Sequence, residues 1–175
     1  MERVPTDLRA LVIECAAQLL VQTRRARSLA VARAQAEDCL DSGAPRRKWD
    51  EMLVAQGADL VAFQRKLKRD HTAPVVLEVK ARRSGYVSKC DARIIGEVIR
   101  NLGGGRLTKE SVVNHDVGLD HIAKPGEAVQ TGATLARIHA VSRLAAAAAS
   151  ARLVEAFQIS RANPPRKPLI VGTIA

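Results

Sequence analysis

The chain has 175 residues, which suffices for one domain or two small subdomains and excludes a large multidomain protein. Hydrophobic residues make up 47% and charged residues 26%, so the chain should fold around a core and is neither disordered nor fibrous. Its few aromatic residues (two Phe, one Trp, one Tyr) cannot supply the stacking surfaces of base-binding modules. The net charge is +10, but basic clusters alternate with acidic residues, so we favour a solvated surface over a nucleic-acid partner as their interpretation.

In the first seventy residues, apolar residues recur with the period of an α-helix, about 3.6 residues. A first helix starts at Pro5-Thr6-Asp7 and carries apolar residues from Leu8 to Leu20. Ser28 is a typical N-cap for a second helix, and Gly43 stands where a left-handed residue ends such a helix.

Two further helices are expected before a break in the pattern. One runs from about Pro45 to Gly57 and should bury Trp49, Met52 and Leu53, and a shorter one covers residues 60–68. Residues 70–74 then have the composition of a linker.

From Val75 onward the apolar residues tend to recur at every second position, which indicates strands. We predict strands at residues 75–80, 86–90, 117–123 and 134–139, with turns at Lys124-Pro125-Gly126 and Thr131-Gly132. Asp91 should cap a helix that ends at Gly103-Gly104-Gly105, and Ser142 should cap an alanine-rich helix reaching about Phe157. A terminal strand is expected at Leu169-Ile170-Val171.

The cysteines and histidines form no metal-binding motif. Cys15, Cys39 and Cys90 lack CxxC spacing, and we expect Cys15 and Cys39 to pack as small hydrophobic residues of a reduced protein. His71, His115, His121 and His139 have no HExxH or HxH grouping, and His115-Asp116 on a strand would point to opposite faces. We therefore expect no metal, no cofactor and no catalytic residue in this chain. The apolar run at residues 144–153 is too short to cross a membrane.

The glycine run that precedes Arg106 has two interpretations. Gly104, Gly105 and Arg106 are weak candidates for phosphate binding, because glycine N–H groups and a guanidinium can hold an anion. The run follows a helix instead of preceding one, however, so no helix N-terminus points at it and a structural helix end is favoured.

Residues 117–138 have the order of strands and Pro-Gly and Gly turns that is typical of one half of a biotinyl/lipoyl-like barrel sandwich. Ser84-Gly85-Tyr86-Val87 resembles the opening strand of the other half. Carrier domains of this type present a lysine at a hairpin tip, flanked in biotin carriers by methionines, and this chain has only Met1 and Met52. A stand-alone biotinyl/lipoyl-like or basic nucleic-acid-binding module stays open as an alternative.

Taken together, the motifs of the chain resemble the pyrimidine nucleoside phosphorylase family, which includes thymidine phosphorylase. The resemblance covers nearly the whole chain, in the order of the family's own motifs. The matching segments are Pro5-Thr6-Asp7-Leu8, Ser28-Leu29-Ala30-Val31-Ala32, Ser42-Gly43-Ala44, Gln56-Gly57-Ala58-Asp59, Gly85-Tyr86-Val87, Leu102-Gly103-Gly104-Gly105-Arg106, Val113-Asn114-His115-Asp116-Val117-Gly118, Lys124-Pro125-Gly126-Glu127-Ala128-Val129-Gln130-Thr131-Gly132 and Pro168-Leu169-Ile170. Ala58, Gly104, Asn114 and Glu127 depart mildly from the family pattern.

The resemblance implies an α+β fold. Residues 1–70 would be a helical segment at the end of the phosphorylase central α/β domain, and residues 75–175 a mixed α/β lobe similar to the family's C-terminal domain, with α/β-hammerhead and barrel-sandwich character. It also implies a cytoplasmic parent enzyme, a homodimer, that converts thymidine or a related pyrimidine nucleoside and phosphate into free base and 2-deoxyribose 1-phosphate.

In the resembled family the phosphate loop and the base-recognition residues lie upstream of the PDL segment, which here is Pro5-Thr6-Asp7-Leu8. We therefore expect this chain to be inactive alone, as a fragment or truncated product, mostly monomeric, with the N-terminal catalytic part of the parent enzyme as its partner.

Overall fold

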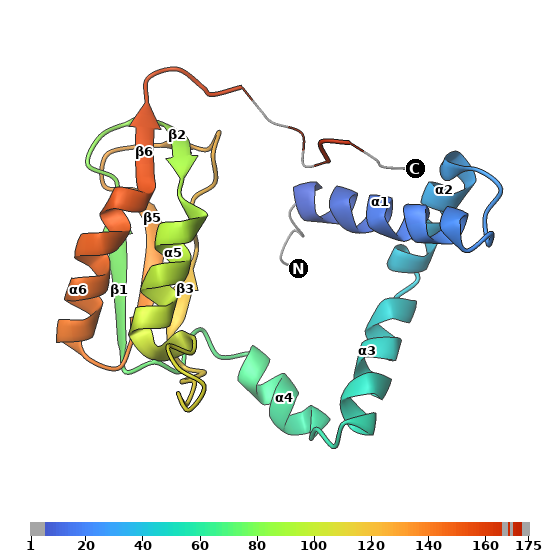
Figure 1. Cartoon of the computed structure of the whole chain (residues 1–175), viewed down its shortest axis with the longest axis horizontal. Coiled ribbons are helices and arrows are strands. Elements are labelled where there is room, and N and C mark those ends of the chain that lie inside the picture. The colour runs from blue at the N-terminus through green and yellow to red at the C-terminus, as the bar shows by residue number, and fades with distance from the viewer. Residues whose placement is uncertain (1–5, 166–167, 169, 173–175) are drawn as a thin grey trace. The chain divides into compact units, whose positions relative to one another are not determined.

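The computed structural model describes residues 6–165, 168 and 170–172. The described residues form two compact units, the first made of residues 6–68 with 168 and 170–172, and the second of residues 69–165. All regular elements among the described residues of the first unit are helices, and the second unit mixes helices with two small antiparallel sheets (Figure 1). This mixed architecture confirms the predicted α+β fold class.

The first unit contains four helices whose ends follow local capping rules. They are α1 (Thr6–Gln22), α2 (Leu29–Asp41), α3 (Ala44–Ala55) and α4 (Leu60–Leu67). Ser28 caps α2 by accepting a hydrogen bond from the Val31 N–H, and Asp59 caps α4 in the same way. Gly43 has a left-handed backbone, with φ of +73°, between α2 and α3, as predicted.

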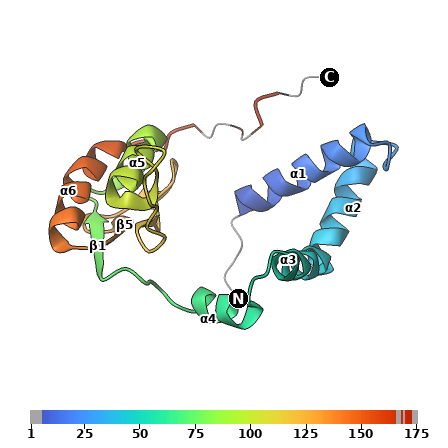
Figure 2. The same cartoon turned by 60° about the horizontal axis from the view of Figure 1, so that its bottom comes forward.

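Helices α1 and α2 pack through small side chains. Ala17, Ala26 and Ala32 are buried at their contact, and Glu14 of α1 pairs with Arg33 of α2 at 2.6 Å. Figure 2 shows the two helices joined at one end as a hairpin, followed by α3. Because alanine lets helices approach closely, a small contact holds this hairpin together.

Several predicted buried positions of this unit are exposed instead. Trp49 and Met52 of α3 keep 44% and 39% of their surface accessible, and Cys15 and Cys39 are exposed. The burial predictions for these four residues are therefore wrong. Leu53 is only partly buried, since none of the described residues of α3 is buried. The ring of Phe63 is tilted against that of Trp49, with centroids 6.4 Å apart, and leaves Trp49 exposed.

The second unit contains two three-stranded antiparallel sheets, with strand orders β1-β5-β3 and β4-β2-β6. The strands are β1 (Val75–Lys80), β2 (Gly85–Cys90), β3 (Gly118–Asp120), β4 (Ala128–Val129), β5 (Thr134–Ala140) and β6 (Phe157–Ser160). In the first sheet the central strand β5 pairs along its length with β1, from Val75 opposite Ala140 to Lys80 opposite Thr134.

Helices α5 (Ala92–Ile99) and α6 (Arg143–Leu153) lie side by side against the first sheet (Figures 1 and 2). Both begin at predicted caps, since Asp91 accepts hydrogen bonds from the Arg93 and Ile94 N–H groups and Ser142 accepts one from the Ala145 N–H. The core lies between helices and sheets, where the largest fully buried side chains are Ile138, Leu153 and Val87. Alanines of α6 let that helix sit close to the sheet.

The strands near residues 117–123 and at the end of the chain differ from prediction. The predicted strand at residues 117–123 is only Gly118–Asp120 long, because His121 has a left-handed backbone (φ +48°) that ends it. In the predicted terminal strand, Leu169 lies outside the described residues, and Ile170 and Val171 are not in a strand.

The alanine-rich helix also ends earlier than expected. It stops at Leu153, a 3₁₀ turn follows, and Phe157 opens strand β6 instead of closing the helix. The physical reason is pairing, since Phe157 lies opposite Cys90 of β2 and buries its ring in the core.

Candidate functional site

The glycine run ends helix α5 through one π-helical turn, Arg100–Gly104. Gly103 has a φ of +98°, and its carbonyl accepts a hydrogen bond from the Asn114 N–H at 2.9 Å. A glycine in the left-handed region at the end of a helix is typical of a C-terminal cap. The glycine run therefore forms a helix end, the interpretation that the sequence favoured.

Gly104 and Gly105 lie against the preceding helical turn. A Cβ on Gly104 would stand 3.0 Å from Ile99 Cγ2 and 3.2 Å from the Ile99 carbonyl oxygen, and one on Gly105 would stand 3.4 Å from Arg100 Cα. Packing therefore accounts for a glycine at position 104. Arg106 is exposed and makes no ion pair or hydrogen bond with another described residue.

A group of charged residues in the second unit surrounds Arg137 of β5. Its Nε and Nη2 donate to both carboxylate oxygens of Asp120 on β3, at 2.8 and 2.6 Å, and Nη1 donates to Asp70 at 3.0 Å. The side chain of Arg137 is only 15% exposed. Because Asp120 lies opposite Arg137 in the register of β3 and β5, the sheet itself brings the two together.

His139 extends this cluster one position further along the same face of β5. Its Nε2 lies 3.1 Å from Asp120 Oδ2 without forming a hydrogen bond, and the side chain is 10% exposed. The ring of His71 is 6.2 Å away, and its Nδ1 lies 3.1 Å from the Ala73 carbonyl oxygen. The cluster thus joins the segment before β1 to the sheet.

Electrostatics keep the carboxylates of this cluster ionised. The hydrogen bonds from Arg137, with a smaller contribution from His139, lower the pKa of Asp120 to about 2. Arg137 likewise lowers the pKa of Asp70. A general base works best with a pKa near the working pH, so these paired carboxylates are suited to holding structure.

The remaining predicted candidates are dispersed. His115 and Asp116 lie in an exposed turn, where the Asp116 N–H donates to Asn114 Oδ1, so the assumption that they share a strand is wrong. His121 stands at the left-handed end of β3. Among the described residues, no group of three or more His, Cys, Asp or Glu side chains could hold a metal ion.

Sequence reasoning missed the cluster around Arg137. One signal was available, since Arg137 and His139 are two residues apart on a predicted strand and so share a face. The identity of their partner was not available, because Asp120 is brought opposite Arg137 only by the register of β3 against β5.

Within the described part of the chain, no helix combines the length and apolarity that a bilayer crossing requires.

Comparison with known proteins identifies the second unit. Residues 86–160 match the family model of the pyrimidine nucleoside phosphorylase C-terminal domain. Over 173 residues, or 99% of this chain, it is 32% identical to thymidine phosphorylases of Sinorhizobium fredii and Rhizobium meliloti. It is also 38% identical over 149 residues to the thymidine phosphorylase of Burkholderia orbicola.

The matched region makes up 40%, 39% and 33% of these three relatives, so the chain spans about two fifths of their length or less. Nearly every residue of this chain nevertheless takes part in the first two matches. The chain belongs to the pyrimidine nucleoside phosphorylase family and corresponds to the C-terminal part of its members.

Proposed function

We propose that this chain forms the C-terminal portion of a thymidine phosphorylase. The reaction of the whole enzyme is the conversion of thymidine and phosphate into thymine and 2-deoxyribose 1-phosphate. The observation that carries the proposal is the 32% identity to thymidine phosphorylases over 99% of the chain. The alternative, a stand-alone biotinyl/lipoyl-like or nucleic-acid-binding module, is not favoured by these relatives.

In this proposal the chain has a structural role, and the catalytic residues lie in another part of the enzyme. Residues 1–70 close the central α/β domain and residues 75–175 form the C-terminal domain. No residue of this chain acts on the nucleoside, and Gly104, Gly105 and Arg106 are the candidates for any contact with phosphate. A phosphorylase must hold phosphate and stabilise a developing positive charge on the sugar, which needs positioned charges. The paired Arg137 cluster offers no free charge for that role.

The proposed partner is the N-terminal catalytic part of the enzyme, within a cytoplasmic homodimer that takes phosphate and a pyrimidine nucleoside. Exposed apolar side chains on the first unit support such a partner. Leu8, Val12 and Leu19 of α1 have 50%, 46% and 61% of their surface accessible, and Trp49 is similarly exposed. Contiguous exposed apolar surface commonly marks an interface. The chain alone should be mostly monomeric, which sedimentation at several concentrations measures.

A chimeric enzyme tests the proposal. This chain replaces the matching part of the Rhizobium meliloti thymidine phosphorylase, and thymine release from thymidine and phosphate is measured by chromatography. We expect the chimera to release thymine. Two controls should release no thymine: the same relative without its C-terminal part, and this chain alone.

The controls separate folding from chemistry. Circular dichroism and sedimentation establish that the chimera is folded and has the assembly of the unmodified relative. A folded, correctly assembled chimera without thymine release contradicts the proposal. Thymine release by this chain alone, in proportion to its concentration, would show that its own residues perform catalysis.

A further inference from the structure

A hollow of about 480 Å³ opens on the second unit where the connection from β1 to β2 approaches strand β6. Its apolar lining includes Leu135, Phe157 and Ile159, which are 4%, 9% and 8% exposed and belong to the core. Three exposed cations, Lys80, Arg82 and Arg83, also line it. Ligand pockets commonly have volumes of about 300–1,000 Å³ and combine apolar walls with a few polar groups, so this hollow has the size and character of a small-molecule site.

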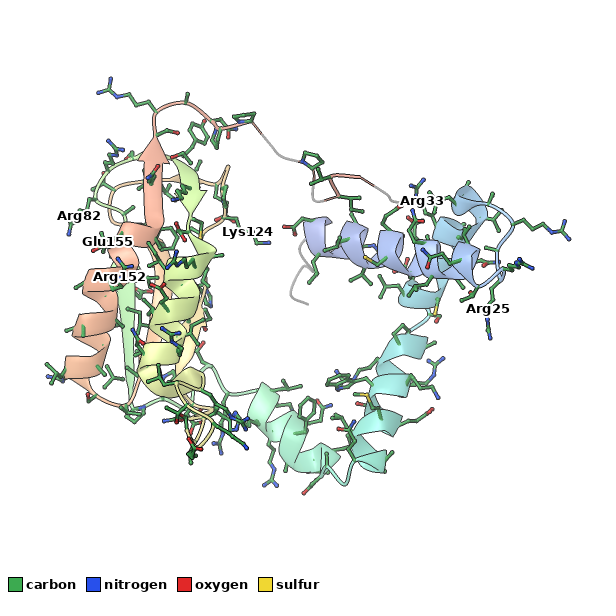
Figure 3. The ribbon with its side chains drawn as sticks, viewed as in Figure 1. Arg25, Arg33, Arg82, Lys124, Arg152 and Glu155 are labelled. Carbon is green, nitrogen blue, oxygen red and sulfur yellow. The ribbon has the colours of Figure 1, made fainter. Side chains whose placement is uncertain are left out.

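The two arginines retain donors for a ligand. Arg83 donates from Nη2 to the Ile159 carbonyl oxygen, which ties its guanidinium to β6 and leaves its other N–H groups available. Arg82 makes no ion pair or hydrogen bond with another described residue. Figure 3 shows Arg82 at the edge of the second unit, extending away from the ribbon. A guanidinium without a partner beside one that is already positioned favours binding of an anion.

The charge of the hollow matches a dianion. Lys80 pairs with Glu78 and donates to Thr134 Oγ1 at 2.8 Å, so its charge is offset. Glu155, next to the lining residue Val154, is paired with Arg152. The charges left over are those of Arg82 and Arg83.

We propose that this hollow binds a small phosphate monoester that carries an apolar body. The doubly charged phosphate would lie between Arg82 and Arg83, which suit its oxygens as fork-shaped donors. The apolar body would cover Leu135, Phe157 and Ile159. The hollow shares no lining residue with the glycine run. The proposal also makes no use of the phosphorylase reaction, so its test does not depend on the proposed function.

Phenyl phosphate is the test probe, because it joins a phosphate dianion to a planar apolar ring. It is titrated at neutral pH and fixed ionic strength into the isotope-labelled full chain, and amide shifts are followed by two-dimensional NMR. We expect saturable shifts at Arg82, Arg83 and Phe157. Benzoate lacks the phosphate dianion, inorganic phosphate lacks the ring, and phenol lacks the charge. Each should bind at least about tenfold more weakly than phenyl phosphate, as expected when one charged or apolar contact is lost.

Two matched variants locate the binding charge. Arg82→Ala should weaken phenyl phosphate binding about tenfold, the loss expected for one charge-assisted contact. Arg106→Ala removes an exposed arginine of the same unit that also lacks a partner among the described residues, and it should leave binding unchanged. Unaltered amide shifts of strand β5 in both variants verify the fold.

Three results would overturn the proposal: shifts that avoid the hollow, equal affinity for benzoate and phenyl phosphate, or equal loss in the two variants. The last would show that general basic charge attracts the probe. Because the wild-type chain is compared across four probes, this part of the test does not depend on whether a variant folds.

Discussion

Replacing Asp120 with asparagine should destabilise the second unit in a pH-dependent way. The pKa of Asp120 falls from its ordinary 3.8 to about 2 in the folded protein, mainly through Arg137. At about 1.36 kcal/mol per pKa unit, the full shift corresponds to about 2.4 kcal/mol. The side chain is 38% exposed, so solvent screening reduces the contribution, and we expect Asp120→Asn to cost about 1 kcal/mol at pH 7.

The sign of the pH dependence follows from the lowered pKa. A carboxyl group that is more acidic when folded stabilises the folded state above its unfolded pKa, and this stabilisation disappears as the pH falls through 3.8 towards 2. The difference between wild type and Asp120→Asn should therefore shrink to about half its neutral value at pH 3. Arg137 keeps its bond to Asp70 in the variant, so its charge is not left without a partner.

Urea unfolding followed by NMR measures this difference. Folded amide signals of β5 report the second unit alone, and free energies of unfolding are compared at pH 7 and pH 3. The control is Glu110→Gln, because Glu110 is exposed in the same unit and has no partner among the described residues. An equal loss at both pH values, or an equal loss in the control, would refute the electrostatic role of Asp120.

Two further predictions concern backbone conformation and thiol reactivity. Gly103→Ala should lower the free energy of unfolding by about 1 kcal/mol or more because φ is +98°, whereas Gly96→Ala, in an exposed helical position with open space, should raise it by up to about 1 kcal/mol. Urea titration of both variants measures the two changes in the free energy of unfolding. Changes in the same direction would contradict the argument. Iodoacetamide should alkylate the exposed Cys15 and Cys39 quickly and Cys90 slowly, because burial raises the pKa of the Cys90 thiol. Peptide mass spectrometry over time measures the rates, and equal rates would contradict the assignment.

Local sequence signals predicted most helix starts and turns of this protein. Ser28, Asp91 and Ser142 each cap a helix by accepting a hydrogen bond from an N–H two or three residues ahead. Gly126 and Gly132 have left-handed backbones in their predicted turns. These features depend only on neighbouring residues, so their residue types suffice to predict them. The ordered motifs also predicted the family, which the comparisons confirm.

Only the tertiary structure decided the features that join distant segments. Phe157 enters strand β6 because Cys90 lies opposite it, although the alanine-rich sequence before it favours helix. Arg137 meets Asp120 through the register of β3 against β5 and meets Asp70 from 67 residues away along the chain. Apolar periodicity identified which helix faces can be buried, but whether Trp49 finds a partner depends on what packs against α3. Pairing, register and burial are set by contacts between segments whose separation in sequence carries no local signal.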